Sequence, residues 1–130
     1  YATAEVAAGL APHYAPFLAL NDRFKQLCTD WQVKGDQPND HTDAAYDHGC
    51  TDRLTALAGE AEPIIAGFAA ALPRMARYQQ RLARAAERVA DGETNRFTGV
   101  MCESFHDIWM ELHEDLIVLQ RVDRAEEGSF

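Results

Sequence analysis

The chain has 130 residues, which is enough for one domain with a hydrophobic core of its own. Its net charge of −9 argues against direct binding to nucleic acid, because such binding draws on the neutralisation of phosphates. No run of 18 apolar residues and no basic start followed by an apolar block occurs, so we expect neither a membrane-spanning helix nor a signal peptide. Cys28, Cys50 and Cys102 have no paired spacing, which favours reduced thiols in a cytoplasmic protein. Because the chain begins with Tyr1, we expect it to be a piece of a longer protein.

Helical periodicity begins near the N-terminus. Phe17, Leu20, Phe24, Leu27 and Trp31 follow one another by three or four positions, which places them on one face of a helix. Two prolines precede this face, at positions 12 and 16, and each removes a backbone donor. We therefore predict a short lead-in helix over about 2–12, then a kink, then a helical bundle over about 14–121.

The next stretch, 33–49, has no periodicity and contains helix breakers, which predicts one long polar loop. A second helix is predicted from about Thr51 to Leu72, bent or divided by Pro63. Pro73 is a favourable first residue for a third helix, and Asp91-Gly92 is typical of its end.

A fourth helix is predicted to start between Asn95 and Val100, with Met101 on its apolar face, and the tail 122–130 is expected to fray. The expected fold is therefore all-α: an antiparallel bundle of four main helices, with a lead-in helix and one long polar loop, in a single domain of residues 1–130. The third helix also carries arginines at positions 74, 77, 81, 84 and 88. We expect them to form a solvated face that pairs with acidic neighbours, with binding of an anion as the alternative.

The fourth helix contains the sequence HDIWMELH, which combines core residues with polar ones. At 100° per residue, His106, Trp109 and His113 share one edge of the apolar stripe, and Glu111 and Asp115 lie on the opposite edge. Two interpretations stay open. The histidines either satisfy their hydrogen bonds at the border of the core, or line a pocket for a ligand or a metal ion.

A second polar cluster, NDHTDAAYDH, occupies residues 39–48. Asp and Asn side chains stabilise turns, and Thr42 or Asp43 is suited to cap a helical turn. A carboxylate beside an imidazole also suits a binding pocket. The candidate ligand-binding residues in this cluster are Asn39, Asp40, His41, Tyr46 and Asp47.

The histidine spacing gives little support for a metal ion. His106 and His113 are seven residues apart, about 10.5 Å along a helix that rises 1.5 Å per residue, so one ion does not readily bind both. A mixed site that combines His41 with one of these histidines and a carboxylate remains open. No cofactor is predicted, and a divalent metal is retained only as an alternative.

Four segments resemble the C-terminal helical region of actinobacterial winged-helix proteins that are described as MarR-type transcriptional regulators. The resemblance covers about residues 15–125. These residues contain no winged-helix segment, so the resemblance does not extend DNA binding to them, and Phe105 stands where the family pattern has Tyr. The segments that carry the resemblance are LNDRFKQLCTDWQV, PNDHTDAAYD, LPRMARYQQRLARA and ESFHDIWMELHEDLI.

The resemblance implies a ligand-sensing or dimerisation domain of a larger regulator, and a homodimer is one of its expected assemblies. We predict that the 39–48 loop closes over the 104–115 helix and forms a small polar pocket for a small molecule. In this pocket the apolar wall is Trp31 and Trp109, and the polar groups are His41, His106, His113 and Glu111. The alternatives are a small metal-dependent or acid/base enzyme that uses the same residues, and a scaffold in which they are structural.

Overall fold

The computed structural model describes residues 4–127, with side chains described for residues 4–120. It contains five α-helices, a two-stranded hairpin and a short 3-10 turn, so the all-α prediction is confirmed. The helices are α1 (Ala4–Gln32), α2 (Ala44–Ala71), α3 (Ala76–Ala90), α4 (Asn95–Thr98) and α5 (Phe105–Glu127), with η1 (Pro73–Met75) between α2 and α3. The antiparallel hairpin consists of β1 (Val33–Lys34) and β2 (Gln37–Pro38).

The helix α1 is continuous, so the separate lead-in helix predicted for about 2–12 is wrong within the described residues. Pro12 and Pro16 both lie inside the helix and are exposed, and Pro63 is likewise exposed inside a continuous α2. An exposed proline is tolerated because water can satisfy the carbonyl that loses its helical donor. The sequence does not show that these three prolines face solvent, and for this reason it predicted breaks where the helices continue.

The predicted loop over 33–49 is shorter than expected. Its first part forms the hairpin, which turns at Gly35 with a positive φ of 68°. Its last part belongs to α2, which begins at Ala44 instead of Thr51. The side chain of Asp43 caps this helix by accepting a hydrogen bond from the backbone N–H of Tyr46. Asp43 was therefore one of the two residues predicted as a cap, but the helix that it caps is the whole of α2 and not a single turn.

The predicted fourth helix is divided into α4 and α5. Ser104 caps the start of α5, because its hydroxyl accepts a hydrogen bond from the N–H of Asp107 and donates one to the carbonyl of Gly99. Met101, which was predicted to face the core, is 98% exposed in the intervening loop. The tail predicted to fray is helical as far as Glu127, and residues 128–130 lie outside the described part.

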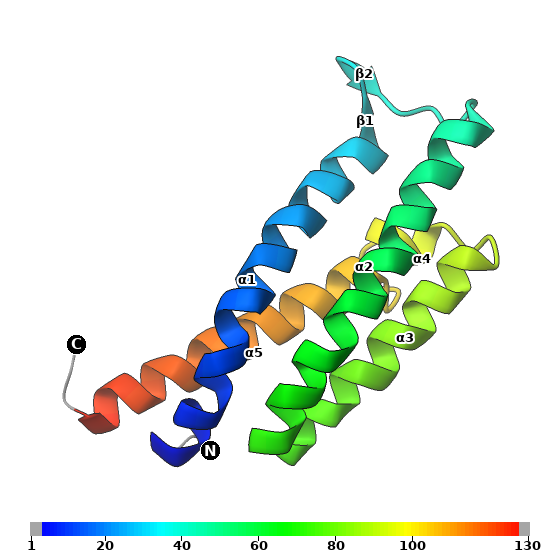
Figure 1. The fold of residues 1–130 in the computed structure, drawn as a ribbon. Coiled ribbons are helices and arrows are strands. Elements are labelled where there is room, and N and C mark those ends of the chain that lie inside the picture. The colour runs from blue at the N-terminus through cyan, green and yellow to red at the C-terminus, as the bar shows by residue number, and fades with distance from the viewer. Residues whose placement is uncertain (1–3, 128–130) are drawn as a thin grey trace.

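Helix α2 packs between α1 and α3, and α5 contacts both α1 and α3 (Figure 1). In that view α5 crosses α1 obliquely, and the hairpin extends from the end of α1 at Gln32. A close approach between α1 and α2 requires Gly67, since a Cβ there would lie 2.4 Å from the ring of His13. The core is largely aromatic where α1 meets α5, through Phe17, Phe24, Phe105 and Trp109.

By length and composition α2 is also apolar enough to cross a membrane. A core helix of a soluble protein meets the same criterion, and one face of α2 is buried through Leu54, Leu57 and Phe68. The expectation that no segment spans a membrane therefore stays a prediction.

Candidate functional site

The edge of α5 that carries His106, Trp109 and His113 faces α1, as the helical periodicity indicates. Trp109 is fully buried, and its ring stacks on Phe17 with 4.8 Å between centroids. The indole N–H donates a 2.9 Å hydrogen bond to the Oδ1 atom of Asn21, which is itself buried. Trp109, which was predicted to form part of the apolar wall of a pocket, is thus a core residue with its polar atom satisfied.

The two histidines lie on the wall of a groove between α1 and α5 of about 410 Å³. Helix α1 contributes both polar and apolar side chains to this groove, and α5 contributes the histidines and a half-exposed methionine. None of the lining residues is acidic, although the chain as a whole has a net charge of −9. The lining residues are Asn21, Phe24, Lys25, Cys28, Thr29, His106, Met110 and His113.

His106 carries an unsatisfied polar atom. Its Nδ1 atom is buried and has no hydrogen-bond partner within the described part of the chain. The ring lies 6.1 Å from that of Phe24, and the ring of His113 lies 5.4 Å from that of Phe17 in an edge contact. Buried polar atoms are paired in most proteins, and an unpaired one costs about 1–3 kcal/mol. In this conformation the protein encloses the atom, so a ligand in the groove would pair with it only after the imidazole ring turns.

Cys28 is the thiol of this groove. Burial raises its pKa to about 12, so the thiol remains protonated at neutral pH. It therefore acts as a small apolar part of the wall, and its chemistry does not suggest a nucleophile.

The opposite edge of α5 faces α3 and forms ion pairs there. Glu111 binds Arg81 at 2.6 Å, and this hydrogen bond holds the pKa of the Glu111 carboxyl below its usual value. Arg74 forms a two-point contact with Asp115 at 2.6 and 2.8 Å, and the hydroxyl of Tyr78 donates to the same carboxylate at 2.8 Å. The pairing expected for the arginine face is confirmed for Arg74 and Arg81. Glu111, however, points away from the groove and is not part of it.

The residues of the 39–47 segment form a compact cluster at the hairpin end of α1. The side-chain amide of Asn39 donates to the carbonyl of Trp31 at 2.8 Å and to Asp47 at 2.9 Å. His41, with a positive φ of 60°, places its Nδ1 atom 2.9 Å from Asp47 and its ring 4.7 Å from that of Trp31. The hydroxyl of Tyr46 donates to the carbonyl of Asp30, and Asp40 accepts from Thr42.

These contacts fix the start of α2 against the end of α1, and they do not extend to the groove. Within residues 4–120, none of the hydrogen bonds of Asp40, His41, Tyr46 or Asp47 reaches a side chain of α5. Trp31 itself stacks on Phe97 of α4, at 4.7 Å. The predicted pocket that joins the 39–48 loop to the 104–115 helix is therefore not formed. The loop residues are a structural cluster, and the histidines of α5 belong to a different site.

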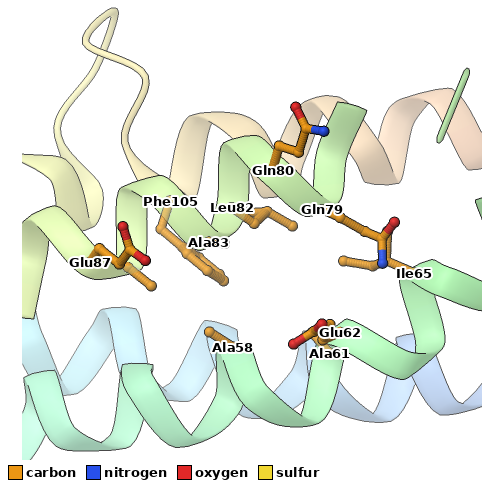
Figure 2. Close-up of a pocket in the computed structure, with 11 residues that line it drawn as sticks. Ala58, Ala61, Glu62, Ile65, Gln79, Gln80, Leu82, Ala83, Glu87 and Phe105 are labelled. Atoms are coloured by element: carbon orange, nitrogen blue, oxygen red, sulfur yellow. The ribbon is translucent and has the colours of Figure 1, made fainter. Parts of the chain in front are cut away.

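A second groove lies between α2 and α3 and has a volume of about 470 Å³. It exists because small side chains face each other, Ala58 and Ala61 on α2 and Ala83 and Ala86 on α3. Figure 2 shows Ala58 across the groove from Phe105, with Glu87 towards one end. The spacing of these alanines was the available sequence signal for a gap between the helices. Among the described residues, none that lines this groove has an unsatisfied buried polar atom. The α1/α5 groove is therefore the stronger candidate for binding a polar ligand.

Asn21, Lys25 and Thr29 were not predicted as site residues. Their sequence signal is a polar residue every four positions along α1, beside the apolar stripe. Among the described residues no group of three or more His, Cys, Asp or Glu side chains is arranged to hold a metal ion. No family model, no curated protein and no solved structure matches this chain. The resemblance to winged-helix regulators, the homodimer and the cytoplasmic location therefore stay predictions.

Proposed function

We propose that this chain is a sensing domain of a larger regulator, built as a helical bundle, and that it binds a small molecule in the groove between α1 and α5. The observation that carries the proposal is a groove of about 410 Å³ whose wall includes two histidines, one of which, His106, has a buried Nδ1 atom without a partner among the described residues. A groove with an apolar floor and a few converging polar groups is the usual form of a small-molecule site.

The lining indicates the chemistry of the ligand. Phe24, Cys28 and Met110 suit an apolar body, and His106, His113 and Lys25 suit an anionic or hydrogen-bonding head group. Lys25 forms no ion pair with any described side chain, so its charge is available to a ligand. The absence of carboxylates from the lining residues favours an anion in a chain that is otherwise acidic. The expected ligand is thus a small amphipathic carboxylate.

The first test measures binding by the intrinsic fluorescence of tryptophan and by thermal denaturation. The probes are benzoate and hexanoate, each compared with its neutral amide. We expect both carboxylates to raise the melting temperature in a saturable way, and the amides to bind more weakly. Fluorescence should change as well, because the buried ring of Trp109 contacts the ring of Phe24, which lines the groove.

Two variants locate the site. His106→Ala and Lys25→Gln should each weaken binding about tenfold or more, which corresponds to the loss of one charge-assisted contact. His48→Ala is the matched control, because this histidine is exposed on α2 and does not line the groove. Equal binding by His106→Ala and wild type, or no response to any carboxylate or amide, would reject the proposal.

A further inference from the structure

Four arginines form a concave cluster where α3 meets α4 and the start of α5. The groove between α2 and α3, which Ala83 lines, is on the other side of α3. The cluster encloses a space of about 100 Å³, comparable to a few water molecules of ~30 Å³ each. Its lining contains four arginines and a single glutamate, within a chain whose net charge is −9. The lining residues are Arg81, Arg84, Ala85, Arg88, Arg96 and Glu103.

The four arginines are engaged to different degrees. Arg81 is fully used, since its guanidinium binds both Glu103 and Glu111. Arg96 donates from one terminal nitrogen to the carbonyl of Cys102, and its Nε atom is buried without a partner. Arg84 and Arg88 form no ion pair with any side chain described for residues 4–120. Three positive charges at this position therefore lack a carboxylate partner.

Glu103 already occupies one side of the cluster. Its pKa is lowered mainly by the hydrogen bond from Arg81, and also by the charges of Arg96 and Arg84. The arginines thus create a positive electrostatic potential beside Glu103, and such a potential favours the binding of an anion there. Counting Glu103 and Glu111 against the four arginines leaves a charge of +2, the difference between +4 and −2. A phosphate monoester carries about −1.5 to −2 at neutral pH, so its charge matches the excess.

We propose that Arg84, Arg88 and Arg96 form a binding site for the phosphate group of a ligand, separate from the α1/α5 groove. The planar guanidinium group offers paired donors whose geometry fits phosphate oxygens. Among the described residues, Arg84 is exposed and forms no ion pair, so its donors are open to an anion, and the Nε atom of Arg96 is buried without a partner. The ion pair between Arg81 and Glu103 and the side chain of Ala85 form the rest of the wall.

The phosphate group has two chemical sources, a soluble compound or the head group of a lipid. The loop that carries Glu103 also carries Val100 and Met101, which are 78% and 98% exposed. Large apolar side chains at such exposure, beside a cationic site, suit insertion into a lipid surface. A soluble phosphate would not need them, so the two sources predict different effects of changing Met101.

The first experiment titrates the full chain with inorganic phosphate and with pyrophosphate, at an ionic strength held constant with chloride. Thermal denaturation and calorimetry should show saturable binding. Arg84→Gln and Arg88→Gln should each weaken it about tenfold. Arg77→Gln is the matched control, since it removes the same charge from the same helix but does not line the cluster, and it should change binding less than about twofold.

The second experiment measures co-sedimentation with vesicles of phosphatidylcholine that contain or lack phosphatidic acid, a lipid whose head group is a phosphate monoester. Binding to the anionic vesicles that is lost in both Arg88→Gln and Met101→Ser assigns the site to a lipid head group. Saturable binding of soluble phosphate that Met101→Ser leaves unchanged assigns it to a soluble ligand. If neither probe binds, or if Arg77→Gln weakens binding as much as Arg88→Gln does, the phosphate site is rejected.

Discussion

The buried hydrogen bond between Trp109 and Asn21 should contribute measurably to the stability of the fold. The indole N–H of Trp109 is fully buried and donates to Asn21 at 2.9 Å, which connects the centre of α5 to α1. The substitution Asn21→Leu removes the acceptor and keeps a side chain of similar size. The indole N–H then has no partner and is shielded from water by the rings of Phe17, Phe24 and Phe105.

The expected cost follows from this burial. An unpaired buried donor costs about 1–3 kcal/mol of the free energy of unfolding. For a chain of this length, 1 kcal/mol corresponds to a decrease of roughly 3–6 °C in melting temperature. Asn21→Leu should therefore lower the melting temperature by roughly 3–18 °C, and by more than a typical substitution on the surface does.

Chemical denaturation followed by far-UV circular dichroism gives the free energies for a double-mutant cycle with Trp109→Phe. The aromatic replacement removes the donor and also leaves a space in the core, so its own cost is larger. Together the two changes should cost at least about 1 kcal/mol less than the sum of the single changes, because neither partner is then left unpaired.

Gln26→Ala is the control for this cycle. This residue also lies on α1, but it is exposed and bonds only to Asp30 on the same helix. Its change should alter stability by less than about 0.5 kcal/mol. The reasoning is refuted if Asn21→Leu is as stable as the control, or if the two changes in the cycle are strictly additive.

Three further predictions concern Asp115, His41 and Cys28. The hydrogen bond from Arg74 lowers the pKa of Asp115, so its contribution to stability is present above the unfolded value of about 3.9 and is lost as the pH falls through the lower folded value. Asp115→Asn should lower the free energy of unfolding by roughly 1–3 kcal/mol at pH 7. The variant should then lose less stability than the wild type as the pH falls below about 4, as measured by denaturation at several pH values. The same dependence of stability on pH in both proteins would contradict this. His41→Ala should lower the melting temperature by about 2–4 °C and leave carboxylate binding in the α1/α5 groove unaltered. A loss of binding would show that the 39–48 segment takes part in that site. Burial raises the pKa of Cys28 to about 12, so iodoacetamide should label it much more slowly at pH 8 than the less buried Cys102, as followed by mass spectrometry; equal rates would contradict the burial.

The sequence by itself determined the helical class and the orientation of α5. Periodicity placed His106 and His113 on one edge and Glu111 and Asp115 on the other, and the structure confirms this division. The end of α3 at Ala90 was also predictable, because Asp91-Gly92 follows it and Gly92 adopts a positive φ of 102°, a conformation that glycine favours. These features are local, because they depend on the rotation per residue and on the conformational preferences of single residues.

The tertiary structure decided which polar groups meet. The sequence places Asp47 near His41, but it does not show that Asn39 and Trp31 would complete that cluster at the hairpin, away from α5. It likewise does not show that Asn21 would satisfy Trp109. Whether a polar atom finds a partner depends on the element that packs against it. Helical periodicity fixes the face of a helix but not its neighbour, so the composition of the α1/α5 groove could be read only from the packed fold.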